Sequence, residues 1–346
     1  MKTLAEIIFQ SDHLTVVHAE SNSKTVFVTF NEVQQTASGT YFWGDATFKR
    51  MGVSAIGFVS AQKNWYPPMH MAAAIAAALR RIGGRRVITY GFSQGGYGAL
   101  KFGARLSASL ALAFSAQWSI NPADVAAFDQ RFTPFYNPML RGGDRIEPRD
   151  LCPRNFLFAD PAFPEDMTHV SRIKATGQAS WIPVPFVRHG TVRVITEGGA
   201  GRKLIEHCLN NQEVTAAGLR HLIRDARANS TMYQRGRIVR LFQSGPRHRR
   251  FLDTAVSRLP DNPEKAMFLV SGHVAANQPD NARAILASLN DDALLSVDLY
   301  RYWALFRAAG LMDCAARLAA LLTVRYSTDE LARLGWAPSN GQSAIV

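Results

Sequence analysis

The sequence predicts a doubly wound, mostly parallel α/β sheet over residues 1–211, followed by an all-α region over residues 212–346. In the first part, short β-rich runs alternate with helix-compatible segments, an order typical of parallel strands covered by helices. In the second part no β-rich run of useful length occurs, and Ala, Leu and Arg dominate. A chain of 346 residues also suits about two domains.

Seven runs rich in β-branched and aromatic residues predict the strands. They are residues 14–19, 25–30, 55–60, 86–90, 110–114, 155–159 and 181–186. The polar residues 20–23 predict a hairpin turn between the first two strands. Pro183 and Pro185 suggest an edge position for the last strand.

Helices are predicted between these strands. They cover residues 69–81, the segment after residue 93 to about residue 106, residues 165–176 and most of residues 191–211. Residues 121–154 interrupt the alternation with several prolines and the pair Gly142-Gly143. We expect this segment to be a lid-like insertion over the carboxyl edge of the sheet.

Two segments of the C-terminal region repeat with a fixed offset. Aligning residues 270–285 with residues 303–318 places Asn277 on Gly310 and Ala282 on Ala315, an offset of 33 residues. The pattern resembles tetratricopeptide repeats, whose helical hairpins recur about every 34 residues. The resemblance implies a TPR-like array that docks a protein partner, and an unrelated helical bundle is the alternative.

The stretch Gly91-Phe92-Ser93-Gln94-Gly95 follows the apolar residues 87–90 and leads into a run of small residues. A G-x-S-x-G between a strand and a helix is typical of a nucleophile elbow, a strained turn that lifts the serine hydroxyl above the sheet. A glycine-rich turn or a phosphate-binding loop is the alternative. The phosphate loop is disfavoured because no Gly-Lys-Ser/Thr follows.

A serine nucleophile needs an imidazole to take its proton and a carboxylate to orient that imidazole. His189 follows the last predicted strand, and Asp160 ends the strand before it. We therefore predict Ser93, Asp160 and His189 as the catalytic set. Asp166 is the alternative to Asp160, although its position is also that of a first-turn helix acid.

The order of serine, acid and histidine at strand ends resembles the α/β-hydrolase superfamily. Residues from about 10 to 211 carry this resemblance, through the elbow, Asp160-Pro161 and His189-Gly190. It implies an acyl-enzyme mechanism and an oxyanion hole with one backbone N–H from Gln94. The second N–H should come from the loop that follows residues 25–30, and it is assigned to Asn31, with Glu32 as the alternative. The sequence departs from the family here, since no His-Gly-Gly-Gly run is present.

The formal net charge of +12 raises the question of an anionic partner. The densest basic run, residues 247–250, is interpreted as a solvated helix start or loop, and without a recognition module no nucleic-acid binding is expected. Residues 1–21 contain acidic and histidine side chains, which predicts no signal peptide, no transmembrane segment and a cytoplasmic location. The separated Cys152, Cys208 and Cys314 indicate free thiols, and neither a metal site nor a cofactor is predicted.

These patterns predict a serine esterase or deacylase that cleaves a carboxylic ester of a small molecule or a glycan. An acyltransferase to a carbohydrate, using the same three residues, is the first alternative. A partner-binding module on a degenerate hydrolase platform is the second. Trp65, Tyr66 and Trp118 are expected near the crevice as substrate-binding residues, with packing as the alternative.

Overall fold

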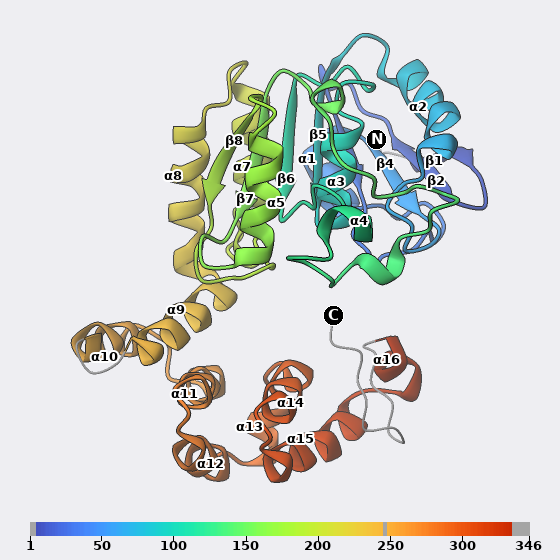
Figure 1. The fold of residues 1–346 in the computed structure, drawn as a ribbon. Coiled ribbons are helices and arrows are strands. Elements are labelled where there is room, and N and C mark those ends of the chain that lie inside the picture. Colours follow the sequence, from blue (N-terminus) through green and yellow to red (C-terminus); the bar gives the residue numbers. More distant parts are fainter. Residues whose placement is uncertain (1–4, 245–247, 334–346) are drawn as a thin grey trace. The chain divides into compact units, whose positions relative to one another are not determined.

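The computed structural model describes residues 5–244 and 248–333, and the chain divides into two compact units between Met232 and Tyr233 (Figure 1). The first unit carries a sheet covered by helices, and the described part of the second unit is helical. This arrangement confirms the fold class expected from the alternation of β-rich and helical segments.

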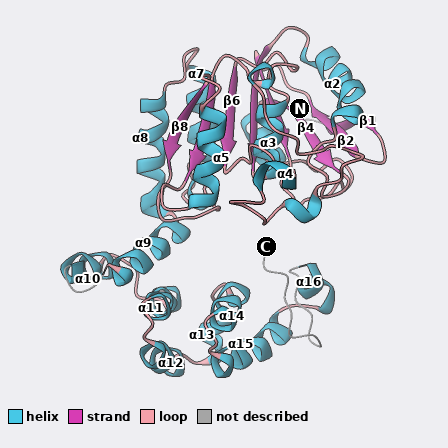
Figure 2. Ribbon diagram, in the orientation of Figure 1, coloured by secondary structure: helices cyan, strands magenta, loops and turns pink. Residues whose placement is uncertain are grey.

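A sheet forms the centre of the first unit (Figure 2). It has eight strands in the order β1-β2-β4-β3-β5-β6-β7-β8. β2 pairs antiparallel with both β1 and β4, and the remaining neighbours are parallel. The strands are β1 Ala5–Gln10, β2 Leu14–Ala19, β3 Thr25–Phe30, β4 Ser54–Ser60, β5 Arg86–Phe92, β6 Leu110–Phe114, β7 Asn155–Ala159 and β8 Ala179–Pro183. β8 lies at the edge, as Pro183 suggests, and Pro185 follows the end of the strand. β1 is a strand that the sequence patterns did not reveal.

β4 lies between β2 and β3, so the predicted hairpin between residues 14–19 and 25–30 is wrong. The serines that suggest a tight turn instead bond to the first residue of β4. Ser54 Oγ accepts the N–H of Ser21 at 2.9 Å, and Ser54 N–H donates to Ser23 Oγ at 2.9 Å. The polar segment thus carries the chain past the end of β4.

Helices cover both faces of the sheet. α2, α3 and α5 pack with one face into the main apolar core, and α1 and α7 pack against each other on the opposite face. Successive side chains of β3 alternate between the two faces of the sheet. Val26 and Val28 join the main core, whereas the ring of Phe27 lies 5.0 Å from that of Phe48 in α1 on the opposite face. The helices are α1 Asp45–Met51, α2 Pro68–Ile82, α3 Gln94–Lys101, α4 Pro122–Val125, α5 Pro164–Lys174, α6 Arg193–Glu197, α7 Gly201–Asn210 and α8 Ala216–Ala226, with short 3-10 turns at η1 Thr133–Phe135, η2 Pro148–Asp150 and η3 Arg227–Asn229.

The first unit extends beyond the sequence-based boundary at residue 211. Helix α8 contacts β8, and it buries Leu219, Ile223 and Ala226. The change in composition therefore marks where the strands stop, whereas the packed unit continues through one more layer of helix.

Two helical hairpins make up the core of the second unit. α11 pairs with α12, α14 pairs with α15, and α11 also contacts α14. Asn277 and Gly310 lie in the two hairpin turns with φ of 56° and 72°, and Ala282 and Ala315 are both buried. The offset of 33 residues thus relates two hairpins of similar build, while the tetratricopeptide class and its partner stay predictions. The helices are α9 Thr231–Gln243, which spans the division, α10 Arg249–Ser257, α11 Pro263–Ala275, α12 Pro279–Ser288, α13 Asp291–Leu295, α14 Leu299–Ala308, α15 Met312–Arg325 and α16 Thr328–Arg333.

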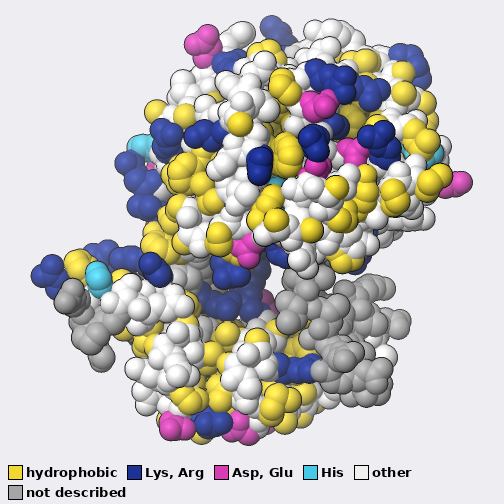
Figure 3. Space-filling view, in the orientation of Figure 1, with side chains coloured by type: hydrophobic (Ala, Val, Ile, Leu, Met, Phe, Trp, Pro, Cys, Tyr) yellow, Lys and Arg dark blue, Asp and Glu magenta, His cyan; other side chains and the backbone are white. Residues whose placement is uncertain are grey.

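Surface charge is dispersed on the face of the first unit that Figure 3 presents, where Lys and Arg stand among hydrophobic and uncharged groups. Of the basic run at residues 247–250, Arg247 lies outside the described residues, and α10 begins at Arg249. Within residues 5–244 and 248–333, no helix has the length and apolar character needed to cross a bilayer. The three cysteines are free and buried, and burial raises the pKa of the Cys152 thiol to about 11.

Candidate active site

Ser93 sits in a tight turn between β5 and α3, with φ 53° and ψ −120°. This is the strained backbone that a nucleophile elbow requires, because an L-residue rarely adopts positive φ. The flanking glycines allow the turn. A Cβ at Gly91 would lie 2.2 Å from Gly95 O, and a Cβ at Gly95 would lie 2.2 Å from Phe30 O, so the helix starts directly against the strands only if both lack side chains.

His189 joins this serine to a buried carboxylate. Its Nε2 lies 2.9 Å from Ser93 Oγ, and its Nδ1 lies 2.9 Å from Asp166 Oδ2 and 3.0 Å from Asp166 Oδ1. Asp166 belongs to the first turn of α5, and His189 follows β8. Ser93 is only 2% exposed, whereas 24% of the His189 side chain is exposed, so the opening to solvent runs over the imidazole.

Asp160, the carboxylate chosen from the sequence, does not contact His189, and that assignment is corrected. Its Oδ2 accepts the backbone N–H groups of Val187 at 2.8 Å and Arg188 at 2.6 Å, and its Oδ1 accepts the N–H of Ala162 at 2.9 Å. Asp160 thus holds the backbone that leads into His189. Asp166 comes after β7 at the start of α5, so its side chain can turn back to the carboxyl edge of the sheet. Its first-turn position was the reason for ranking it second from the sequence.

The surroundings of Asp166 favour its ionised form. Burial opposes ionisation of this carboxyl, but His189 and Arg131, which donates to Oδ1 at 2.8 Å, outweigh burial and hold the Asp166 pKa below its ordinary value. An ionised Asp166 accepts a hydrogen bond from Nδ1–H of His189, which leaves Nε2 as the acceptor facing Ser93 Oγ. This tautomer is the one that a general base needs.

One of the two predicted oxyanion donors fits the geometry. Gln94 is the first residue of α3 and directly follows Ser93, and its N–H has no acceptor among the described residues. Asn31 is corrected, because its N–H donates to Phe58 O at 3.1 Å and continues the β3–β4 ladder. The next N–H, of Glu32, has no acceptor in the described part of the chain. Glu32, the alternative left open, is therefore the better candidate for the second donor.

The three predicted substrate-binding aromatics are packing residues in this structure. Trp65 and Tyr66 are both 0% exposed, and Tyr66 OH donates to Asn31 Oδ1 at 2.6 Å. Trp118 is partly buried and donates from Nε1 to Ile146 O at 3.1 Å. Complete burial removes Trp65 and Tyr66 from any accessible surface, so their assignment is corrected, and the indole of Trp118 bonds to the insertion.

The insertion at residues 121–154 does reach the site. The ring of Phe132 lies 5.5 Å from the imidazole of His189, and Phe92 at the end of β5 lies 5.3 Å from it. Trp65 supports Phe132 at a ring distance of 5.3 Å. The Ser93–His189 pair is therefore flanked by aromatic rings, one of which comes from the insertion.

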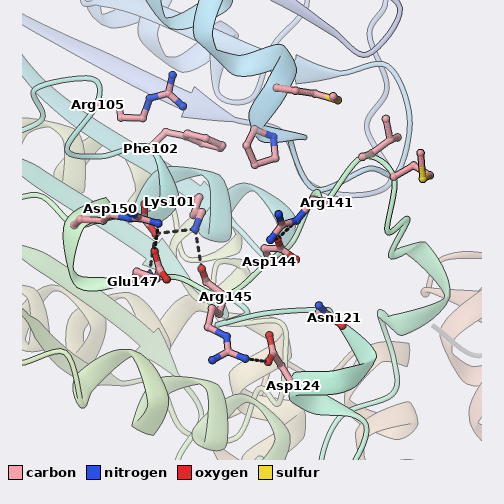
Figure 4. A pocket seen from close by; sticks show the side chains of 15 residues that line it. Lys101, Phe102, Arg105, Asn121, Asp124, Arg141, Asp144, Arg145, Glu147 and Asp150 are labelled. Carbon is pink, nitrogen blue, oxygen red and sulfur yellow. Dashed lines mark hydrogen bonds and ion pairs between the residues drawn. The ribbon is translucent and has the colours of Figure 1, made fainter.

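Two cavities lie apart from Ser93. An apolar cavity of about 190 Å³ opens between α1 and α7, lined by Phe27, Gln35, Tyr41, Trp43, Gly44, Thr47, Phe48, Tyr90, Leu112, Thr196, Gly201, Leu204 and Ile205. A polar cavity of about 640 Å³ lies between the end of α3 and the insertion (Figure 4). Among its basic residues, Lys101 Nζ lies 2.7 Å from Asp150 and Arg141 lies 2.8 Å from Asp144, whereas Arg105 lies over the ring of Phe102 at 5.9 Å.

Comparison with known proteins gives distant structural likenesses alone. No protein-family model and no curated protein matches the sequence. A capsule O-acetyltransferase of Neisseria meningitidis serogroup A is similar at a TM-score of 0.43 and 10% identity, covering 59% of this chain and 93% of its own. Est1E from Butyrivibrio proteoclasticus is similar at a TM-score of 0.42 and 12% identity, covering 60% and 99%. Pyrococcus horikoshii acylaminoacyl peptidase is similar at a TM-score of 0.43 and 11% identity, covering 61% and 42%.

At that level of likeness, what those proteins act on says nothing about this chain. The sheet order, the elbow after β5 and the positions of the acid after β7 and the histidine after β8 belong to the chain itself. On these features the first unit has an α/β-hydrolase fold.

Proposed function

We propose that the protein is a serine hydrolase that cleaves carboxylic esters through an acyl-enzyme on Ser93. The observation that carries this proposal is the continuous hydrogen-bonded path from Ser93 Oγ through His189 to Asp166, with two links of 2.9 Å. A nucleophile, a base and an orienting acid in hydrogen-bond reach are the geometric signature of this chemistry. A degenerate platform would have no reason to retain both links.

In the proposed reaction, Ser93 Oγ attacks the ester carbonyl carbon while His189 Nε2 takes the hydroxyl proton. Asp166 stabilises the resulting imidazolium through Nδ1–H. The N–H groups of Gln94 and Glu32 are the proposed donors to the carbonyl oxygen as it becomes negative. The C–O bond to the leaving alcohol then breaks, and Nε2–H protonates that alcohol. Water attacks the acyl-enzyme by the same route in reverse and regenerates Ser93.

The net charge of the protein supports the proposed substrate class. A net charge of +12 favours an ester whose alcohol or acyl part is polar or anionic, such as an acylated glycan. No metal or cofactor takes part in this proposal, since a serine and its base supply the nucleophile.

Labelling by a fluorophosphonate probe tests the proposal directly. Wild-type protein should label and should hydrolyse a short-chain aryl ester, and Ser93→Ala should lose both without a change in melting temperature. Ser107→Ala is the matched control, because Ser107 also has positive φ, at 55°, and lies in the turn that precedes β6. A wild-type protein that neither labels nor turns over a panel of aryl and glycan acetates would overturn the proposal.

Acyl transfer to a carbohydrate hydroxyl is the second candidate. Hydrolysis and transfer share the acyl-enzyme on Ser93 and differ in what attacks it, and the rings of Phe92 and Phe132 beside His189 offer apolar surface for a bound sugar acceptor. An acyl-enzyme formed from an aryl acetate should then decay faster when sugar acceptors are added, with an acetylated sugar as product. Decay that is the same with every acceptor leaves hydrolysis as the reaction.

A further inference from the structure

Arg131, in the insertion, bonds to two carboxylates at once. Its guanidinium lies 2.7 Å from Asp129 Oδ2 and 2.8 Å from Asp166 Oδ1, and its Nε donates to Asp129 Oδ1 at 2.9 Å. Asp166 is 1% exposed and Asp129 is 4% exposed. Arg131 also stacks over the rings of Phe132 and Phe163, at 5.1 and 4.7 Å. The cation is therefore held in a defined place behind the acid that orients His189.

The hydrogen-bonded network of Asp166, Arg131 and Asp129 ends at His169, which is neutral. His169 Nδ1 accepts the backbone N–H of Trp118 at 3.0 Å, so the ring proton sits on Nε2, which faces Asp129 Oδ2 at 3.0 Å. His169 thus donates to Asp129 without adding charge. Burial opposes ionisation of Asp129, but the hydrogen bonds from His169 and Arg131 and the charge of Arg131 hold the pKa of Asp129 below its ordinary value.

Charged groups from several elements surround His189. Asp166 and Asp129 are anionic and Arg131 is cationic, so this network carries one net negative charge. Further charged groups near His189 come from other elements: Glu32 after β3, Lys63 after β4 beside Glu32, Asp160 after β7 and the neighbouring Arg188. The variants below leave all four of these unchanged.

We propose that Arg131 is a positioning residue of the Ser93 reaction, which holds the Asp166 carboxylate against His189 and limits how readily His189 takes a proton. The inference rests on the proposed function. The two effects have a common origin. The guanidinium fixes one oxygen of Asp166, and its positive charge opposes formation of the imidazolium nearby. Because Arg131 lies in the insertion, the insertion becomes part of the proton-transfer machinery.

Two single substitutions separate charge from disruption. Arg131→Gln removes a positive charge near His189. The acidic limb of the plot of kcat against pH should therefore move to higher pH by about one unit. Asp129→Asn removes a negative charge, so the limb should move to lower pH by about as much. A loss of structure would lower kcat in both variants and would not shift the limb in opposite directions.

Two further variants separate position from charge. Arg131→Lys keeps the positive charge but loses the bidentate hydrogen bonds of the guanidinium. Its acidic limb should stay at the wild-type pH, and its kcat should fall by about 10-fold. The double variant Arg131→Gln with Asp129→Asn restores the net charge of the network, so the limb should return close to the wild-type position while kcat stays low. KM should change little in all four. Arg149→Gln, in the same insertion with an exposed ion pair to Glu147, is the matched control and should behave as wild type.

An NMR titration of ring-labelled histidine gives a readout that needs no turnover. The His189 signal, identified by its loss in His189→Gln, should titrate at higher pH in Arg131→Gln and at lower pH in Asp129→Asn. Identical midpoints in both, or shifts in the same direction, would overturn the role of Arg131. If Ser93→Ala has no effect on labelling or turnover, the proposed function fails, and the titration still decides whether Arg131 governs His189.

Discussion

The carboxylate of Asp160 accepts the backbone N–H of Arg188 at 2.6 Å, one residue before His189. Asp166, six residues further along the chain, contacts the His189 ring itself. Two acids near the end of β7 thus have separate tasks. One shapes the loop that carries the histidine, and the other faces its Nδ1.

Substitution of each acid by asparagine should distinguish these tasks. Asp166→Asn removes the charge that stabilises the imidazolium and disturbs its tautomer, so kcat should fall about 10³- to 10⁴-fold. Asp160→Asn keeps one accepting oxygen for two of the three N–H donors at best, and should cost about 1–3 kcal/mol of stability with a much smaller loss of kcat. Steady-state kinetics and chemical denaturation measure both. A larger kcat loss in Asp160→Asn would reinstate Asp160 as the orienting acid.

The elbow should not tolerate a methyl group at Gly95. Because the added Cβ would meet the backbone oxygen of Phe30 at 2.2 Å, Gly95→Ala should destabilise the protein by about 1–3 kcal/mol and remove probe labelling of Ser93. Gly201→Ala is the control, since its nearest neighbour would be the Ile195 side chain at 3.8 Å in the first turn of α7. Thermal unfolding should find that control unchanged or slightly more stable. A Gly95→Ala protein with normal labelling would contradict the interpretation of this turn as a nucleophile elbow.

The Asp129 carboxylate predicts a loss of stability in acid. Its pKa is lowered in the folded protein, so its contribution is present above its unfolded value of about 3.9 and is lost as the pH falls below that value. The gap in unfolding free energy between wild type and Asp129→Asn should therefore be constant from pH 7 to 5 and shrink below about pH 4. Urea denaturation at a series of pH values measures it. A gap that widens in acid would reverse the sign of the interaction.

Glu32 should show the opposite behaviour. Burial raises its pKa, an effect that the Gln34 N–H and the charges of Lys63 and His189 oppose. The folded protein then favours the neutral form, and the stability contribution falls as the pH rises through the folded pKa. Glu32→Gln should therefore gain stability relative to wild type as the pH increases from 4 to 7. Differential scanning calorimetry across this range checks the trend, and a constant difference would mean that the carboxyl is well solvated.

Truncation should locate the end of the first unit. A fragment of residues 1–232 keeps α8, whereas a fragment of residues 1–211 loses it and uncovers the apolar surface that Leu219 and Ile223 bury. Each such side chain contributes about 1.5–3 kcal/mol, so the shorter fragment should aggregate or melt well below the longer one. Probe labelling should persist in residues 1–232. Equal stability of the two fragments would restore the boundary at residue 211.

The features that the sequence determined by itself are those set by neighbours along the chain. The elbow at Ser93 was predictable because its glycines stand within two residues of the serine, and only glycine fits there. The hairpin turns at Asn277 and Gly310 were predictable because an offset of 33 residues is visible in the letters alone. His189 was predictable as a residue that follows the last strand.

The tertiary structure decided which distant groups meet. Asp160 and Asp166 both follow β7, and only the fold turns the second one toward His189, 23 residues away. Arg131 reaches Asp166 from 35 residues upstream, through an insertion with no periodic pattern to reveal its path. Asn31 is a further example, because its N–H donates to the neighbouring strand β4, which lies beside β3. Local sequence sets backbone conformation through steric contacts within a few residues, whereas the pairing of side chains depends on the packing of elements across the whole sheet.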